Sequence, residues 1–294
     1  MDTSLDDWTG WVGREETLRA RIDAAPVAAL AATLDLEGAP TEGQPLPPGW
    51  HWLFFNPVAR QSALGDDGHP RRAANSFLPP INLPRRMWAG SRIRYLASLQ
   101  VGAEAERSSR ILRITPKEGK SGPMCFVTVA HSVASGGRTC IEEEQDIVYR
   151  AATPLAPASG GSTIPERAVT PAPLLAPWKR TVNPDAVLLF RYSALTFNGH
   201  RIHYDLPYAQ VEEGYRGLVV HGPLAATLLQ GFAASLRPGL SLAAFEFRGM
   251  QPLFAGQPFT LCADEAGKGA LALHAVAPDG RVAVEAFARF APQS

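Results

Sequence analysis

The C-terminal part of the sequence combines one apolar helix with a series of short strands. Residues 223–236 (PLAATLLQGFAASL) are apolar on nearly every side, which predicts a helix that is buried all round. Four segments with strand character then follow: 245–250, 258–265, 269–278 and 281–290. The Asp279-Gly280 pair between the last two is a strong hairpin signal. This order describes an antiparallel sheet wrapped round one helix.

A proline- and glycine-rich segment, AATPLAPASGGSTIPERAVTPAPLLA, occupies residues 151–176. Such a composition cannot bury a core and favours an extended linker. It divides the 294 residues into two parts of similar size, and each part is long enough for one domain. We therefore predict domains at 1–150 and 177–294.

The N-terminal half shows weaker signals for secondary structure. Residues 17–37 have the composition of a helix, and Pro26 is expected to interrupt it as the first residue of a second helix. Residues 49–55 (GWHWLFF) alternate as a strand does. Between 91 and 150 we expect several antiparallel strands, two of them joined by a Ser-Gly-Gly-Arg turn.

Composition argues against several classes of protein. A hydrophobic content of 46% with 19% charged residues is typical of a globular chain, and 28 basic residues balance 28 acidic ones. That balance predicts no nucleic-acid or membrane partner. Three widely spaced cysteines without a Cys-x-x-Cys motif suit reduced thiols. With no signal peptide or membrane span in view, we expect a cytoplasmic protein.

A strand-like segment, 187–197, leads into a loop that holds His200 and His203. His203 is the natural acid–base residue because the unperturbed pKa of histidine lies near neutrality. Asn198 can hold a water or orient the imidazole, and Thr196 can do so more weakly. His200 and the adjacent arginine either face outward or contact a charged part of the substrate.

The next histidine begins the motif His221-Gly222-Pro223-Leu224. Pro223 fits the first position of the buried helix, which places Gly222 at its N-cap. Unpaired amides and partial positive charge at a helix start suit a developing oxyanion. The alternative is an ordinary helix start preceded by a buried histidine, and the residues alone leave both interpretations open.

A metal site is the other interpretation of this cluster. His200 and His203 with Asp205 and His221 offer four ligands. A two-residue spacing is common by chance, however, and neither a His-Glu-x-x-His motif nor a cysteine pair supports it. We predict no metal and no cofactor.

The loop and the helix start together resemble the MaoC-like, or R-specific enoyl-thioester hydratase, family. The matching residues are Asn198, Ile202-His203-Tyr204-Asp205, Tyr208-Ala209 and Val220-His221-Gly222. Thr196 stands where the family has its first catalytic aspartate, and two extra residues separate Asn198 from His203. These departures resemble the subgroup of type 2 hydroxyacyl-thioester dehydratases.

The resemblance implies an α+β fold of the tandem, or double, hotdog type, in which each antiparallel sheet wraps round a central helix. The C-terminal hotdog would carry the catalytic loop, and the dehydratase-like N-terminal hotdog would lack it. The resemblance also implies His203 as catalytic residue, Asn198 as its polar partner and the Gly222 amide as donor to the thioester oxygen. Thr196 and His221 are expected beside the substrate.

The resemblance further implies a hydro-lyase that adds water reversibly to an enoyl-CoA. Relatives of this layout suggest a short branched dicarboxylic substrate, as in itaconate degradation, where itaconyl-CoA or mesaconyl-C4-CoA gives citramalyl-CoA. The acyl carboxylate needs a cation, and the candidates are Arg201, Arg85 and Arg86. The two neighbouring arginines lie in 83–95 (LPRRMWAGSRIRY), which resembles the turn before the helix in the N-terminal hotdog. We expect a homodimer.

Three rival functions stay open at this stage. The first is a dehydratase of straight-chain hydroxyacyl thioesters. The second is a hotdog thioesterase, which needs a carboxylate such as Asp205 or Glu212-Glu213 near the helix. The third is a non-catalytic acyl-CoA-binding subunit, because Thr196 replaces the usual acid.

Overall fold

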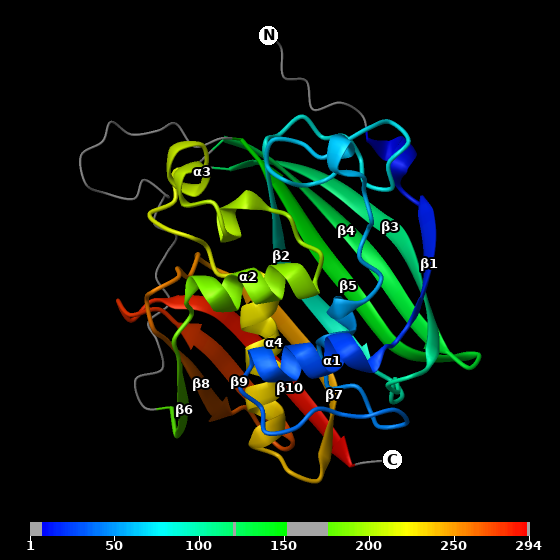
Figure 1. The fold of residues 1–294 in the computed structure, drawn as a ribbon, viewed down its shortest axis with the longest axis vertical. Helices are drawn as coiled ribbons and strands as arrows, with labels where there is room; N and C mark the ends of the chain where they lie inside the picture. The colour runs from blue at the N-terminus through cyan, green and yellow to red at the C-terminus, as the bar shows by residue number, and fades with distance from the viewer. Residues whose placement is uncertain (1–7, 120–121, 152–175, 293–294) are drawn as a thin grey trace.

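The computed structural model describes residues 8–119, 122–151 and 176–292. Within these ranges ten strands form one antiparallel sheet in the order β1-β3-β4-β5-β2-β7-β10-β9-β8-β6. Strands of the N-terminal half fill one side of this order and those of the C-terminal half fill the other (Figure 1). The two halves join where β2 pairs with β7.

The N-terminal half begins with a strand and a helix and continues, after a long connection, with four strands. Its elements are β1 (Glu15–Arg21), α1 (Ala24–Thr33), β2 (Arg85–Tyr95), β3 (Glu104–Gly119), β4 (Gly122–Ser135) and β5 (Arg138–Arg150). Between α1 and β2 the described chain forms two short 3₁₀ turns, at Trp50–Leu53 and Gln61–Ala63, and isolated bridges but no α-helix.

The C-terminal half has a similar order of elements with three helices. Its elements are β6 (Trp178–Val182), α2 (Ala186–Leu195), α3 (Leu206–Val211), α4 (Gly222–Ser235), β7 (Leu240–Gly249), β8 (Phe259–Glu265), β9 (Ala270–Val276) and β10 (Val282–Pro292). A 3₁₀ turn, Arg201–His203, lies between α2 and α3. None of the helices in the described ranges has the length and apolarity that a bilayer crossing requires.

Helix α4 forms the centre of the C-terminal core. Leu224, Leu229 and Phe232 are almost completely buried, and the helix packs against β7, β8, β9 and β10. Figure 1 shows this helix lying across the strands of its own half. Each buried leucine or phenylalanine contributes about 1.5–3 kcal/mol. The predicted helix, the four strands after it and the hairpin at Asp279-Gly280 are therefore confirmed.

The predicted helix over 17–37 is wrong in its first part. Residues Glu15–Arg21 form β1, whose side chains alternate in burial and whose backbone pairs with β3. Only one helix follows, and it begins at Ala24, so Pro26 lies in its first turn and does not start a second helix. Tertiary pairing overrides the local helical composition here.

Two predicted strands are helical. Residues 187–197 belong mainly to α2, which Asp185 caps by accepting a hydrogen bond from the Leu188 amide at 2.7 Å. Residues 49–55 contain the 3₁₀ turn Trp50–Leu53, which follows Gly49 at φ 83°. In both segments most residues are apolar, so the sequence does not show which of them are spaced as on one face of a helix.

The structure of residues 83–95 also differs from the predicted turn. They form strand β2 from Arg85 to Tyr95 and not a turn before a helix, because the N-terminal half has no helix at this point. The strands predicted between 91 and 150, with a turn at Gly136-Gly137, are confirmed. Most of the predicted linker, 152–175, lies outside the described residues.

Candidate active site

The loop after α2, residues 196–205, holds the side chains on which the functional prediction depends. Thr196 caps the C-terminus of α2, and its hydroxyl donates to the Tyr192 carbonyl at 2.8 Å. Phe197 then adopts φ 49°, a left-handed conformation that turns the chain away from the helix. The loop continues through Asn198 into the turn Arg201–His203.

His203 is buried, with 6% of its surface exposed, on the wall of a cavity. Its Nδ1 lies 2.7 Å from the Val219 carbonyl oxygen. A carbonyl only accepts, so Nδ1 carries the hydrogen and Nε2 is left as an acceptor. Burial lowers the pKa of His203 to about 4, against the effect of the Val219 hydrogen bond. The imidazole is therefore neutral at neutral pH.

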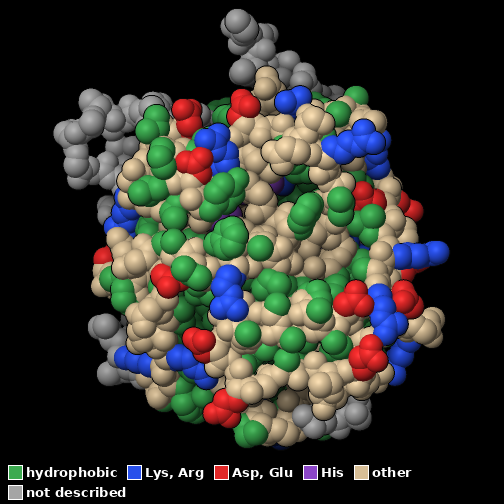
Figure 2. All heavy atoms as spheres, in the orientation of Figure 1, with side chains coloured by type: hydrophobic (Ala, Val, Ile, Leu, Met, Phe, Trp, Pro, Cys, Tyr) green, Lys and Arg blue, Asp and Glu red, His purple; other side chains and the backbone are tan. Residues whose placement is uncertain are grey.

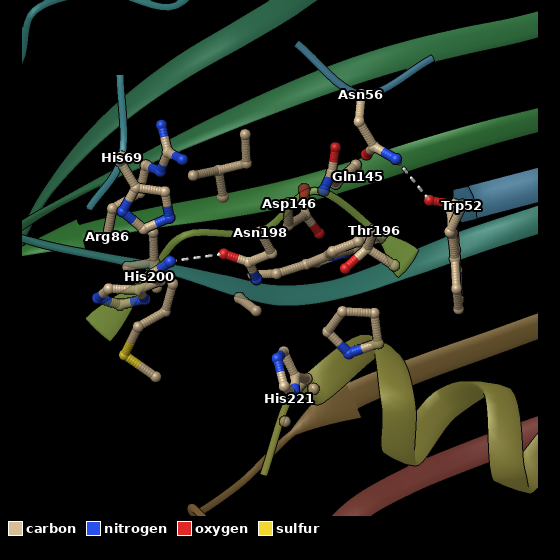
Figure 3. A pocket seen from close by; sticks show the side chains of 18 of the residues that line it. Trp52, Asn56, His69, Arg86, Gln145, Asp146, Thr196, Asn198, His200 and His221 are labelled. Carbon is tan, nitrogen blue, oxygen red and sulfur yellow. Dashed lines mark hydrogen bonds between the residues drawn. The ribbon is translucent and has the colours of Figure 1, made fainter. Parts of the chain in front are cut away.

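Asn198 presents its amide nitrogen to the same cavity. Its Oδ1 accepts a hydrogen bond from the His200 amide at 3.0 Å, which fixes the orientation of the side chain. Figure 3 shows Asn198, Thr196 and His221 facing one space. Asn198 therefore offers a donor beside His203, which offers an acceptor.

His221 connects this loop to α4. Its ring stacks on that of His203 with centroids 3.6 Å apart, and its Nε2 lies 2.8 Å from the Ser193 hydroxyl. The structure places His221, not Gly222, at the N-cap, because the helical turn starts one residue earlier than predicted. Gly222 is the first helical residue and lines the cavity, so its amide has no acceptor within the helix.

The cavity has a volume of about 1870 Å³ and lies between the two halves. Six of the seven histidines line it: His51, His69, His131, His200, His203 and His221. In Figure 2 small parts of histidine side chains are visible in a recess bordered by hydrophobic side chains. The volume exceeds that of an ordinary small-molecule pocket, about 300–1,000 Å³, and suits a long ligand.

The three arginines predicted to contact an acyl carboxylate are in different surroundings. Arg86 is half-buried on the cavity wall, next to His69 and His200 in Figure 3, and no ion pair joins it to a described carboxylate. Arg85 is buried against Glu213 at 3.1 Å, away from the cavity wall. Arg85 was therefore a wrong choice, because the pleat of β2 turns neighbouring side chains to opposite faces.

Arg201 was also a wrong choice for the substrate carboxylate. Its guanidinium binds Asp205 at 2.7 Å and donates to the Asp66 carbonyl at 2.9 Å, and it does not line the cavity. Asp205 in turn caps α3 by accepting from the Tyr208 amide.

The carboxylates on which the thioesterase alternative depends are also away from the cavity. Asp205 accepts hydrogen bonds from Arg201 and caps the N-terminus of α3, and Glu213 pairs with Arg85. The metal set predicted from His200, His203, Asp205 and His221 does not converge either. The rings of His203 and His221 are stacked, and Nε2 of His221 bonds Ser193.

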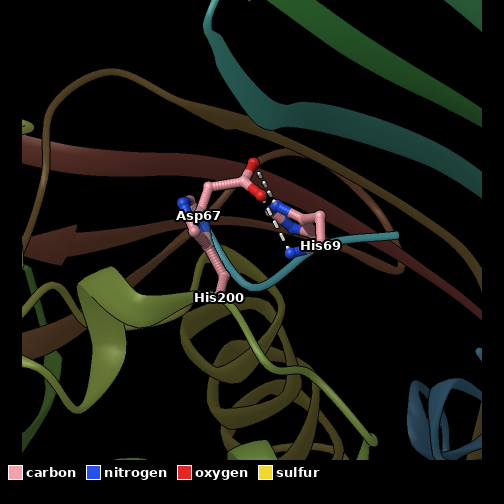
Figure 4. A group of neighbouring side chains, drawn as sticks. All are labelled: Asp67, His69 and His200. Carbon is pink, nitrogen blue, oxygen red and sulfur yellow. Dashed lines mark hydrogen bonds and ion pairs between the residues drawn. The ribbon is translucent and has the colours of Figure 1, made fainter. Parts of the chain in front are cut away.

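Two polar residues that the sequence analysis did not identify reach this site from the N-terminal half. Asp67 and His69 belong to a short loop, residues 64–70, whose ends pair as a bridge between Leu64 and Pro70. Nδ1 of His69 lies 3.0 Å from Asp67 Oδ2 (Figure 4). The sequence Asp-Asp-Gly-His carried a signal, since it is a turn that presents a histidine after a glycine.

The 64–70 loop docks directly on the 196–205 loop. The Arg201 amide donates to the Asp67 carbonyl at 3.0 Å. Gly68, at φ 85°, approaches Gly199 so closely that a Cβ on Gly68 would lie 1.9 Å from the Gly199 oxygen. This contact brings the His69 ring to within 4.3 Å of the His200 ring, centroid to centroid.

Residues 49–255 match the family described as hydroxyacyl-thioester dehydratase type 2. The chain belongs to this family. It is 50% identical, over 286 residues, to mesaconyl-C(4)-CoA hydratase of Chloroflexus aurantiacus, covering 96% of this chain and 98% of that protein.

Further relatives agree with this assignment. The mitochondrial hydroxyacyl-thioester dehydratase type 2 of Schizosaccharomyces pombe is 30% identical over 247 residues, covering 76% of this chain and 79% of that protein. A Mycobacterium tuberculosis structure described as a double hotdog fold aligns with a TM-score of 0.53 at 14% identity, covering 95% of this chain and 96% of that one. The predicted family, the double hotdog fold and the hydro-lyase class are confirmed.

Proposed function

We propose that the protein adds water reversibly across the double bond of a short branched dicarboxylic enoyl-CoA of the mesaconyl-C4-CoA type, forming citramalyl-CoA. The observation that carries this proposal is the meeting of His203, Asn198 and the Gly222 end of α4 on one cavity wall. The substrate class is supported by 50% identity to mesaconyl-C(4)-CoA hydratase over nearly the whole of both chains.

The arrangement suits water addition to an enoyl thioester. Nε2 of His203 accepts a hydrogen from the water, and the Asn198 amide donates to the water oxygen. As the oxygen bonds to the β-carbon, the electrons of the double bond move towards the thioester oxygen. The Gly222 amide and the partial positive charge of the α4 N-terminus stabilise that oxygen as an enolate.

The carboxylate of the acyl group binds Arg86 in this proposal. A half-buried guanidinium without an ionic partner among the described residues favours an anionic ligand. Arg86 lies near the reaction centre, next to His69 and His200 (Figure 3). Burial lowers the pKa of both histidines, and the charge of Arg86 lowers it further. In mesaconyl-C4-CoA the carboxylate is attached to the carbon that receives the hydroxyl, so the cation has to lie this close.

The test is to follow the loss of enoyl-thioester absorbance with mesaconyl-C4-CoA and crotonyl-CoA, and the formation of citramalyl-CoA with itaconyl-CoA, whose double bond is not conjugated to the thioester. We expect the largest kcat/KM with a dicarboxylic substrate. Arg86→Gln should raise KM for that substrate about 10- to 100-fold, as expected when a buried ion pair is lost, and should leave KM for crotonyl-CoA unchanged. Equal effects on both substrates would contradict the carboxylate contact.

A straight-chain hydroxyacyl-thioester dehydratase is the second candidate. It is favoured by the similarity to the Schizosaccharomyces pombe dehydratase and by the large cavity. In the same assay, a higher kcat/KM for crotonyl-CoA than for either dicarboxylic thioester would favour this candidate.

The remaining parts of the proposal concern domains, location and assembly. We propose hotdog units at 1–150 and 177–294 joined by the 151–176 segment, supported by the similar order of elements in the two halves. Three free, buried cysteines support a cytoplasmic location. The homodimer is supported only by family resemblance and is tested by sedimentation.

A further inference from the structure

Thr196 stands where the resemblance to MaoC-like hydratases places a catalytic aspartate, so this position supplies no carboxylate to the reaction. Its hydroxyl is bound to the Tyr192 carbonyl and is a poor proton acceptor. His203 is a weak base, because its imidazolium would face only a neutral carbonyl in full burial. A second group that can hold the proton of the water is therefore required.

The 64–70 loop supplies a histidine with the properties of a base. His69 donates its Nδ1 hydrogen to Asp67 Oδ2 at 3.0 Å, and the Asp67 side chain also accepts from the His69 amide at 2.9 Å. Both bonds fix the ring, so Nε2 is left as an acceptor on the cavity wall. The arrangement is that of a histidine oriented by a carboxylate.

His69 and His203 both lie against the imidazole of His200. The ring of His200 is 4.3 Å from that of His69 and 5.5 Å from that of His203, centroid to centroid. Both outer rings have Nδ1 occupied by a protein acceptor, so both present an unprotonated Nε2. Each of these nitrogens can accept a hydrogen from a molecule bound in the cavity.

We propose that His69, backed by Asp67, is the second acid–base residue of this site and replaces, from the opposite half of the chain, the carboxylate missing at Thr196. The assignment rests on the proposed hydration of an enoyl thioester. His203 and Asn198 hold the water, and the proton that leaves it goes to His69.

The step balances without any further reactant. The water oxygen forms a bond to the β-carbon and loses one proton to Nε2 of His69, while the double-bond electrons become the enolate at the Gly222 amide. The imidazolium then returns that proton to the α-carbon, and the enolate reverts to the thioester. The product has gained one hydrogen and one hydroxyl, and His69 is neutral again.

The charges around the pair favour this order. Burial alone would raise the pKa of Asp67, but the hydrogen bonds that it accepts from the His69 ring and amide hold this pKa well below its usual range, so Asp67 is ionised. Burial and then Arg86 lower the pKa of His69, against the effect of Asp67. His69 therefore starts neutral, as a base must. A substrate carboxylate on Arg86 would offset the charge of Arg86 and make His69 more basic.

Asp67, His69 and His200 are also near enough to one another to ligate a metal, with their ligand atoms within 4.8 Å. Acid–base chemistry suits them better. Asp67 is already engaged by two hydrogen bonds from His69, and the positive charge of Arg86, which acts on both histidines, disfavours a cation beside them. If a chelator abolishes the activity and zinc restores it, the acid–base assignment is overturned in favour of a metal.

The decisive comparison is Asp67→Asn against Asp66→Asn. These neighbours receive the same change, but the Asp66 side chain is exposed and only its backbone carbonyl contacts the 196–205 loop. We expect Asp67→Asn to lower kcat by on the order of 10² with both mesaconyl-C4-CoA and crotonyl-CoA. Asp66→Asn should behave as wild type. His69→Gln should lose about 10²–10⁴.

The pH profile separates a base from a structural residue. The charged and titratable groups around His69 are Asp67, Arg72, Arg86, His200 and His203. Hydration needs neutral His69, so the rate falls as the pH drops through its pKa. Asp67 raises that pKa, and Asp67→Asn should therefore move the acid limb to lower pH. A reduced rate with an unmoved acid limb would overturn the assignment.

The measurements distinguish a wrong role for His69 from a wrong proposed function. If wild type hydrates none of the enoyl-CoAs, the proposed function is wrong. If wild type is active and His69→Gln keeps its rate, only the role of His69 is wrong. A loss confined to the dicarboxylic substrate would make His69 a carboxylate contact and overturn the acid–base role. Thermal unfolding and quenching of tryptophan fluorescence by a saturated acyl-CoA establish that each variant is folded and binds.

Discussion

The two halves differ most in what lies between their first helix and the strand that follows. In the C-terminal half this space holds α4, whose apolar side chains fill the concave side of β7–β10. In the N-terminal half, residues 34–84 contain no α-helix, only 3₁₀ turns and isolated bridges. The N-terminal sheet therefore keeps buried polar groups facing the cavity, such as Glu143, which accepts from His51 and Trp52.

This difference gives each half its own contribution to one site. The helix of the C-terminal half provides an amide at its N-terminus, and the loop before it provides His203 and Asn198. The half without the helix provides space and a loop long enough to cross to the other side, where it places His69. Neither half carries the complete set of groups.

The largest expected loss of activity comes from a change in the contribution of the C-terminal half. His203→Gln should reduce kcat by about 10²–10⁴, the usual effect of removing a positioned acid–base group. His274 is the matched control, since it is the one histidine that does not line the cavity. Initial rates of hydration measure the effect. If the folded His203→Gln protein retains wild-type kcat, the chemistry does not depend on the C-terminal loop.

The contact between the halves is tested at Gly68. Gly68→Ala places a methyl 1.9 Å from the Gly199 oxygen in a residue at φ 85°. It should push the 64–70 loop away, with a cost of about 1–3 kcal/mol in the free energy of unfolding and a roughly 10-fold or greater loss of kcat through misplaced His69.

The control for Gly68 is Gly43→Ala. Gly43 has φ 80° but open space around it, so this change isolates the backbone cost from the clash. Urea unfolding and initial rates are compared for the two variants. If Gly68→Ala loses stability but not activity, docking of the two loops does not contribute to catalysis.

The parts of the fold that the sequence predicted are those with a strong local pattern. The buried helix and the strands after it carry apolar runs and a hairpin pair, and they were predicted with small errors at their ends, except that β7 begins five residues before the predicted 245. Strand β1 was missed because Glu15–Arg21 is half exposed and owes its conformation to pairing with β3, which lies far along the chain. The helix α2 was missed although Asp185 caps it, because its exposed Val187 and Phe190 hide the helical spacing.

The site shows the same limit. The motif in 196–205 and the helix start predicted five residues that line the cavity: Thr196, Asn198, His203, His221 and Gly222. They also predicted Arg201, which does not line it. Asp67 and His69 could not be assigned in this way, because their proximity to His200 results from the docking of two loops about 130 residues apart. Likewise, only the pleat of β2 distinguishes Arg86, on the cavity wall, from Arg85, buried against Glu213.

The smallest expected effect concerns the amide that α4 contributes. A Cβ at Gly222 would lie 3.8 Å from the Trp88 carbonyl, an ordinary contact, so Gly222→Ala should fold. Its methyl would stand in the cavity where a thioester oxygen approaches the amide, and kcat/KM should fall about 10-fold. Gly231→Ala, in the same helix with open space round it, should keep the rate and gain about 0.5–1 kcal/mol. If both variants are fully active, the thioester oxygen does not bind at the N-terminus of α4. The helix then contributes to the site only by packing against its sheet.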